Sequence, residues 1–359
     1  MVETSNTKRP TMGDVAKLAG VSRKTVSRVY NSEPTVAEEL VAKVRIAAEQ
    51  LNYKMNMVAS DLRRSGRRPS TIGLLIQDVS NEFSASIFRS VEDVAEQYGV
   101  TVLASNLDES EERERQLTSI LIARRVDGLL IVPAGLDQSY LGDDQRTGTP
   151  FVFLDRPPHL LRADIVLSSN EDGALSGVTH LIEHGHHRIA FIGETGTHEP
   201  ARLRLSGYRL ALQLAGIPLD PSIIRRDLQT ESEAEFAIID LLSSKSPPTA
   251  VFAAHNRLTK GVVKGLRRLG IQESFALVGF DDFELAYLLQ PAVTVVAQDP
   301  ATIGRLGAET LFKRIHRDAS PVTTQIVQTT LIPRGSGEIV PFKSQRENLQ
   351  GPGSPSEIA

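Results

Sequence analysis

Residues 13–31, GDVAKLAGVSRKTVSRVYN, contain two short helical patterns separated by a glycine. Before the first pattern, Thr11 and Asp14 have the spacing of a capping box, in which each side chain accepts a hydrogen bond from the other residue's backbone. Gly20 is placed to end the first helix, because glycine readily adopts the left-handed conformation that follows many helices. Ser22 is a good N-cap for the second helix. A third amphipathic helix is predicted over residues 37–51, so the region is a small three-helix domain with a helix-turn-helix motif.

The charge of the chain is unevenly distributed. Residues 1–69 hold 13 Lys and Arg against 7 Asp and Glu, whereas residues 70–359 hold 27 against 37, so a net charge of +6 precedes a net charge of −10. A basic block at the start of an acidic protein indicates that a polyanion contacts this block. A solvated basic face on a purely structural three-helix domain is the alternative, and charge alone does not exclude it.

Two cations open the second helix of the motif. Arg23 and Lys24 oppose the helix macrodipole there and bring no folding benefit. A recognition helix that enters the major groove of DNA needs cations at this end, because Arg and Lys make the commonest specific contact to guanine. Arg28, about one and a half turns further on, is placed to contact bases or phosphates. Hydroxyl side chains suited to phosphates are Thr11, Ser22, Thr25 and Ser27.

From residue 71 onward, short apolar runs alternate with amphipathic segments. Continuous apolar strands separated by helices are typical of parallel sheets covered on both faces. Some 250 residues of this pattern exceed one doubly wound sheet, so two α/β lobes are predicted. The predicted strands are 71–78, 101–105, 128–134, 150–155, 165–169, 189–194, 249–255, 275–282 and 293–298, and the predicted helices are 84–98, 110–125, 170–184, 199–215, 257–269 and 300–316.

Several function classes lack their sequence signals. The chain has no cysteine, no apolar run long enough to span a membrane and no apolar segment of a secretory leader near its N-terminus, so a cytoplasmic protein is expected. No dinucleotide fingerprint, P-loop or serine elbow occurs, so no enzyme and no cofactor are predicted. Four histidines have metal-like spacing but no H-E-x-x-H motif, so no metal site is predicted; they are His180, His184, His186 and His187.

Beyond the helix-turn-helix stretch, further motifs resemble the lactose/galactose repressor (LacI/GalR) family, from about Thr11 to Arg334. They are LNYKMNMVASDLRRS (51–65), TIGLLIQDVSNEF (71–83), GVTHLIEHGHHRIAFIG (177–193), ARLRLSGY (201–208), LVGFDD (277–282) and LIPRGS (331–336). The resemblance implies a sequence-specific transcription regulator, a repressor, which binds pseudo-palindromic operator DNA as a homodimer and responds to a small effector. It also implies a core of two lobes like that of periplasmic sugar-binding proteins.

The resemblance implies a domain organisation and the DNA contacts. Arg23 and Lys24 match the variable base-reading positions, and Leu62 matches a leucine that wedges into the minor groove and kinks the operator. Further DNA contacts are implied for Arg28, Asn31, Ala59 and Arg63. The implied parts are a DNA-binding domain (1–55), a hinge helix and linker (56–69), an effector-binding and dimerisation core (70–342) and a disordered tail (343–359). Within the core, lobe 1 is expected at about 70–168 and 298–328, and lobe 2 at about 169–297 and 329–342.

For the effector, the resemblance implies a cleft between the lobes. The implied contacts are Phe83, Asp155, Arg204, His255, Asn256 and Asp281. Carboxylates and an arginine suit the paired hydrogen bonds of sugar hydroxyls, so a sugar or sugar derivative is expected. A nucleobase or nucleoside is the alternative, since Phe83 could stack on a ring. Asp281 and Arg204 could instead form a salt bridge that closes the lobes, and His255 suggests an affinity that changes with pH between about 6 and 7.

Three departures from the family pattern affect these expectations. His255 and Asn256 stand where the family usually has Asn-Asp, and Ser84 replaces a frequent aromatic residue. Both changes bear on effector identity. Ala37 replaces the usual Ser or Thr at the start of the third helix, so its cap is expected from Thr35. Two other protein classes also fit part of the chain. A solute-binding protein lacks the basic helix-turn-helix, and an α/β enzyme fused to a DNA-binding module lacks a catalytic constellation here.

Overall fold

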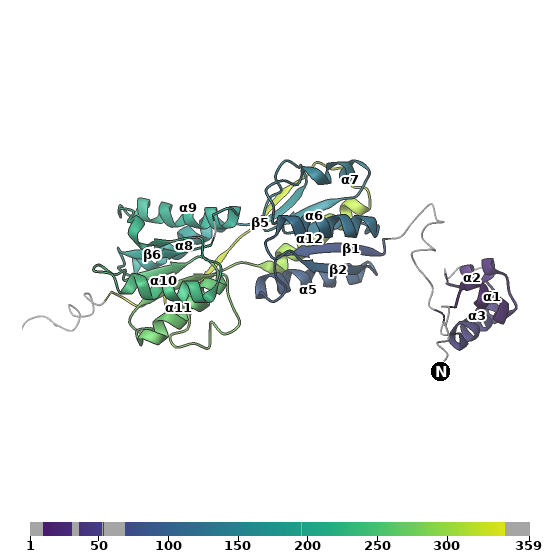
Figure 1. Ribbon diagram of the computed structural model, residues 1–359, viewed down its shortest axis with the longest axis horizontal. Coiled ribbons are helices and arrows are strands. Elements are labelled where there is room, and N and C mark those ends of the chain that lie inside the picture. The colour runs from purple at the N-terminus through teal and green to yellow at the C-terminus, as the bar shows by residue number, and fades with distance from the viewer. Residues whose placement is uncertain (1–9, 31–35, 52, 54–68, 195, 342–359) are drawn as a thin grey trace, which may run out of the picture. The chain divides into compact units, whose positions relative to one another are not determined.

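The computed structural model describes residues 10–30, 36–51, 53, 69–194 and 196–341. Two compact units make up the chain, Met1–Arg68 and Pro69–Ala359, and each is described by itself (Figure 1). The predictions made for Asn31, for the cap from Thr35, for the hinge helix with Ala59, Leu62 and Arg63, and for the C-terminal tail lie outside the described residues.

Within residues 10–30, 36–51 and 53, the first unit has three helices, α1 (Met12–Ala19), α2 (Arg23–Tyr30) and α3 (Glu38–Gln50). The capping box is present, since the Thr11 N–H donates to the Asp14 carboxylate at 2.7 Å and the Asp14 N–H donates to the Thr11 hydroxyl at 3.4 Å. Gly20 follows α1 with φ +64°. One fully buried valine from each helix forms the centre of the core: Val15, Val26 and Val44. The predicted helix-turn-helix fold is confirmed.

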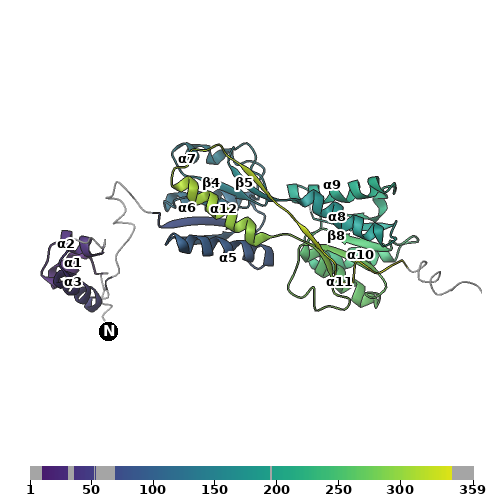
Figure 2. The same ribbon diagram turned by 180° about the vertical axis from the view of Figure 1, so that it is seen from behind.

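The second unit is built on two six-stranded sheets, and each sheet forms one lobe (Figures 1 and 2). The strands of lobe 1 are all parallel, in the order β11-β5-β4-β3-β1-β2. They are β1 (Thr71–Ile76), β2 (Thr101–Asn106), β3 (Leu129–Ile131), β4 (Phe151–Leu154), β5 (Asp164–Ser168) and β11 (Thr324–Val327).

The sheet of lobe 2 has the order β12-β10-β9-β8-β6-β7, and β12 is antiparallel to its neighbour. Its strands are β6 (Ile189–Ile192), β7 (Ile224–Arg225), β8 (Ala250–Ala253), β9 (Ala276–Phe280), β10 (Thr294–Ala297) and β12 (Thr330–Ile332). The central strands β6, β8 and β9 are buried along their whole length, as their apolar runs predict.

Helices cover the sheets of both lobes. In lobe 1 these are α5 (Glu82–Gln97), α6 (Glu111–Ala123), α7 (Gly142–Arg146) and α12 (Pro300–Ile315). In lobe 2 they are α8 (Asn170–Glu183), α9 (Glu199–Leu214), α10 (Glu231–Leu242) and α11 (Asn256–Leu269). The two-lobed α/β fold is confirmed, whereas α7, α10 and the strands β7, β11 and β12 were not predicted from the sequence.

In residues 69–194 and 196–341, the chain crosses between the lobes three times. The crossings follow β5 at residues 168–170, β10 at 297–300 and β11 at 327–330. Ser169 and Thr329 link two of these segments, since the Thr329 N–H donates to the Ser169 hydroxyl at 3.0 Å. Strand ends from both lobes are therefore brought to one region of the core.

Two of the four histidines singled out in the sequence contact the C-terminal segment of lobe 2. The His180 ring lies 2.5 Å from the Glu338 carboxylate, and His186 contacts the Ile339 carbonyl at 2.7 Å and the Thr249 hydroxyl at 2.9 Å. These contacts give His180 and His186 structural roles. In the described part of the chain, no group of three or more His, Cys, Asp or Glu is arranged to hold a metal ion, and no helix is both long and apolar enough to cross a membrane.

Candidate functional site

The start of α2 presents cations to solvent. Arg23 and Lys24 are exposed, and the first turn of the helix contains no acidic residue. The hydroxyl of Ser22 caps the helix by accepting from the Thr25 N–H at 3.0 Å, and it also contacts the Thr25 hydroxyl at 2.9 Å. The capping bonds fix this end of the helix, so the two cations project from a defined backbone. An anionic partner would compensate the unfavourable interaction of these cations with the helix dipole.

Of the remaining predicted DNA contacts, Thr11 is exposed at the start of α1, and its hydroxyl donates to the Asp14 carboxylate at 2.6 Å. Ser27 and Arg28 are half-buried on α2. These three predicted contacts thus lie at the start of α1 and on α2.

A cavity of about 620 Å³ lies between the lobes of the second unit. Most of its polar lining comes from residues that follow strand ends, which is the usual ligand position in parallel α/β sheets. Five of the six predicted effector contacts line it: Phe83, Asp155, Arg204, His255 and Asp281. Asn256 is not among the lining residues. It is buried, and its side-chain amide pairs with that of Asn81 at 3.1 and 3.3 Å.

Asp155 follows β4 and forms part of the lobe 1 wall. It is 8% exposed, and its Oδ1 is buried with no hydrogen-bond partner among the described residues. Burial raises the pKa of Asp155 to about 6, against the opposing attraction of Arg156 and Arg204. A buried carboxylate oxygen without a partner is costly, so a ligand that donates a hydrogen bond there would be favoured.

Asp281 follows β9 on the lobe 2 wall and is held by two neighbours. Its Oδ1 accepts from the Gln298 amide at 2.5 Å, and its Oδ2 accepts from Arg204 at 3.4 Å. Arg204 is anchored more firmly elsewhere, donating to the Asn170 side chain and the Ala254 carbonyl at 2.8 Å each. Because Arg204 and Asp281 both belong to lobe 2, this pair does not close the lobes on each other.

His255 caps α11 at the edge of the cavity. Its Nδ1 accepts from the Arg257 N–H at 3.2 Å, and its Nε2 lies 3.6 Å from the Glu194 carboxylate. Burial lowers the pKa of His255 to about 4, so the ring is neutral at pH 7 with its hydrogen on Nε2. The expectation that His255 makes the affinity change between pH 6 and 7 is therefore wrong, whereas burial raises the pKa of Asp155, on the opposite wall, to about 6.

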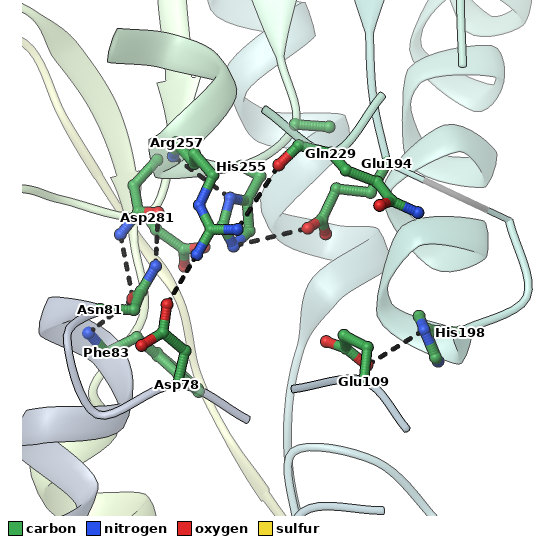
Figure 3. A network of polar contacts seen from close by, with 12 residues as sticks. Asp78, Asn81, Phe83, Glu109, Glu194, His198, Gln229, His255, Arg257 and Asp281 are labelled. Atoms are coloured by element: carbon green, nitrogen blue, oxygen red, sulfur yellow. Dashed lines mark hydrogen bonds and ion pairs between the residues drawn. The ribbon is translucent and has the colours of Figure 1, made fainter. Parts of the chain in front are cut away.

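Polar contacts join the lobes on both sides of the cavity (Figure 3). On one side, Arg257 donates to Asp78 at 2.9 Å and Lys260 donates to Glu82 at 2.7 Å. On the other side, His198 lies 3.2 Å from the Glu109 carboxylate. None of these residues was predicted from the sequence as part of the site. One available signal was that Asp78 and Glu109 come just after β1 and β2, where parallel strands place side chains at a common edge.

Both units match known protein families. Residues 11–56 match the model of bacterial regulatory proteins of the lacI family, and residues 178–337 match a periplasmic binding protein-like domain. The ribose operon repressor of Escherichia coli is 34% identical over 91% of this chain and 99% of its own length.

Several solved structures are similar over nearly the whole chain, including the following two. The lac repressor dimer bound to operator and an anti-inducer has 28% identity and a TM-score of 0.80, covering 92% of this chain and 99% of that one. A complex of the transcriptional regulator CelR with cellobiose has 29% identity and a TM-score of 0.67, covering 91% and 100%.

A helix-turn-helix domain followed by a two-lobed ligand-binding core defines a DNA-binding transcription regulator. The chain belongs to the lacI family of bacterial regulatory proteins.

Proposed function

We propose that this protein is a cytoplasmic transcription repressor whose affinity for a pseudo-palindromic operator is controlled by a neutral, hydroxyl-rich ligand, a sugar or sugar derivative, bound between the lobes. Three buried polar atoms support the ligand class. Asp155 Oδ1, Gln298 Oε1 and Arg156 Nε are buried atoms of residues that line the cavity, and none has a hydrogen-bond partner among residues 69–194 and 196–341. A polyol has hydroxyl groups that both donate and accept, so it is the ligand class that could pair with both the oxygens and the guanidinium.

The charges of the cavity also favour a neutral polyol. The guanidinium of Arg156 forms two hydrogen bonds to Glu109, at 2.6 and 2.7 Å, and Arg204 contacts Asp281. These cations are therefore already compensated, whereas a phosphate or carboxylate ligand would require uncompensated ones. The cellobiose complex of the CelR regulator is a precedent for a sugar in this fold.

The ligand would act by changing how the lobes associate. It would contact Asp155 of lobe 1 and Asp281 of lobe 2 at once, and polar contacts such as Asp78–Arg257 join the lobes beside it. A ligand shifts a conformational equilibrium only by its difference in affinity for the two states. Contact with both lobes provides such a difference.

On DNA, we assign base contacts to Arg23, Lys24 and Arg28, and phosphate contacts to Thr11, Ser22, Thr25 and Ser27. The hinge helix of residues 56–64 would insert Leu62 into the minor groove, flanked by Ala59 and Arg63. Two copies related by a two-fold axis require inverted half-sites, and the lac repressor binds its operator as a dimer.

The nucleobase alternative rests on one observation, which is that the Phe83 ring lines the cavity and could stack on a planar ligand. A thermal-shift screen of the full-length protein against sugars, polyols, nucleobases and nucleosides separates the two proposals, because a ligand of the folded state raises its melting temperature. A sugar that stabilises the protein and changes its affinity for a selected operator supports the proposal. Stabilisation by nucleobases alone overturns the sugar assignment.

A further inference from the structure

Gly13 occupies an unusual place in α1. It lies in the first turn of the helix, directly before Asp14 of the capping box. Its backbone is helical, so nothing in its conformation requires glycine. Glycine disfavours a helix relative to alanine, because it loses more conformational freedom on folding. A glycine here therefore calls for an explanation outside the backbone of α1.

The explanation is the side chain of Arg23. A Cβ atom placed on Gly13 would lie 2.6 Å from Arg23 Nη2, 2.9 Å from Nε and 3.0 Å from Cζ. Separations below 3.0 Å are not tolerated by real Cβ atoms. The guanidinium of Arg23 thus packs against the backbone of α1, in space that exists only because residue 13 has no side chain.

The contact with α1 leaves the hydrogen-bond donors of Arg23 unused. Within residues 10–30, 36–51 and 53, no hydrogen bond or ion pair of the Arg23 guanidinium is present. A guanidinium that packs against another element keeps its N–H donors for a bidentate contact to a base. It also loses less conformational entropy when that contact forms. We propose that Gly13 is a positioning residue for Arg23, and that it sharpens base selection by leaving room for the guanidinium on α1. This inference rests on the base-reading role proposed for Arg23.

Gly13→Ala in the full-length protein tests the inference. The clash involves the far end of a flexible side chain, so the variant is expected to fold and to melt at the same temperature as wild type or higher, while the guanidinium is displaced. Operator sites selected from a random library should lose preference at the same base position that Arg23→Ala affects, by about 3- to 10-fold. Preference at the position affected by Lys24→Ala, and affinity for nonspecific DNA, should not change.

A double-mutant cycle separates the two proposals. In the Arg23→Ala background, Gly13→Ala should have no further effect on base preference, because the restrained group is gone. If Arg23→Ala alters the selected site but Gly13→Ala does not, the positioning role is wrong and the proposed function stands. If Arg23→Ala leaves the selected site unchanged, the base-reading role of Arg23 is wrong and the inference fails with it. Circular dichroism melts of each variant verify folding.

Discussion

Asp155 and Asp281 occupy equivalent positions in the two lobes. Asp155 directly follows β4, and its N–H donates to the Val166 carbonyl of β5 at 2.8 Å. Asp281 directly follows β9, and its N–H donates to the Val296 carbonyl of β10 at 2.9 Å. Both aspartates have a left-handed backbone, with φ 63° and 68°. Asp and Asn tolerate this conformation better than most residues do. Asp155 and Asp281 therefore reach the cavity from corresponding places in the two sheets.

Asp155→Asn should stabilise the protein at neutral pH while weakening ligand binding. The raised pKa of about 6 means that the folded state binds the proton more tightly than the unfolded state does, so this carboxyl stabilises the fold less as pH rises from 4 to 6. We expect the free energy of unfolding of Asp155→Asn to exceed that of wild type by about 1–3 kcal/mol at pH 7 and to match it near pH 4. Urea unfolding at both pH values measures this, and an equal difference at both would contradict it.

Asp281→Asn should weaken ligand binding without removing operator binding. The substitution keeps the shape and the left-handed backbone but replaces one acceptor oxygen with a donor group, so one ligand hydroxyl is mispaired. The expected loss is about 1–3 kcal/mol of ligand affinity. Calorimetry with the ligand found by the screen measures it, and Asp282→Asn, which changes a carboxylate paired with Arg334, is the matched control. Wild-type affinity in Asp281→Asn would place the binding site elsewhere.

Local sequence patterns account for much of the fold. The capping box of Thr11 and Asp14 and the left-handed Gly20 involve residues close in the chain, so the sequence alone reveals them. The two-residue strand β7 is too short to produce a periodic pattern. Helix α10 does have a local signal, since Thr230 and Glu233 form a capping box at its start.

The site was only partly predictable because its groups are distant in sequence. Asp78 and Arg257 pair across 179 residues, and no local pattern encodes such a contact. The resemblance supplied Asp155 and Asp281, but the titration expected for His255 depended on its burial, which only the packing of the lobes determines. The unpartnered atom Gln298 Oε1 likewise became visible only in three dimensions.

Arg257→Met should weaken ligand binding modestly, because it removes the ion pair with Asp78 that joins the lobes beside the cavity. Arg257 and Asp78 are 40% and 33% exposed, so the pair contributes less than about 1 kcal/mol. Titration calorimetry should show an affinity loss of about this size. Arg305→Met, which removes a pair within α12, is the control and should bind normally. A loss of equal size in the control would argue against a role for the contact between the lobes.

Leu62→Ala should reduce operator bending and specific affinity. The resemblance assigns Leu62 to a minor-groove wedge, and an alanine is too short to unstack a base step. Affinity for nonspecific DNA should be unchanged, because it depends on phosphate contacts rather than on the wedge. A circular-permutation gel assay reports the bend angle, and unchanged bending would contradict the hinge assignment.

Leu288→Asp should convert the proposed dimer to a monomer. The segment between β9 and β10 exposes three large apolar side chains within four residues: Leu285 is 57%, Tyr287 61% and Leu288 63% exposed. Clustered exposed apolar residues are typical of interaction surfaces, and a dimer with two-fold symmetry places the same surface of each copy in contact. In the dimer, an aspartate within this surface would place the carboxylates of the two copies close together and away from water.

The dissociation constant of the dimer should therefore rise by roughly 100-fold or more in Leu288→Asp, as expected for a central interface residue. Sedimentation velocity over a concentration series measures this constant. Affinity for a palindromic operator should fall in parallel, because one half-site is then bound without its partner, whereas affinity for an isolated half-site should be retained. Leu160→Asp, at an equally apolar side chain that is 78% exposed in lobe 1, is the control and should remain dimeric. A Leu288→Asp protein that sediments as a dimer would place the interface on another surface.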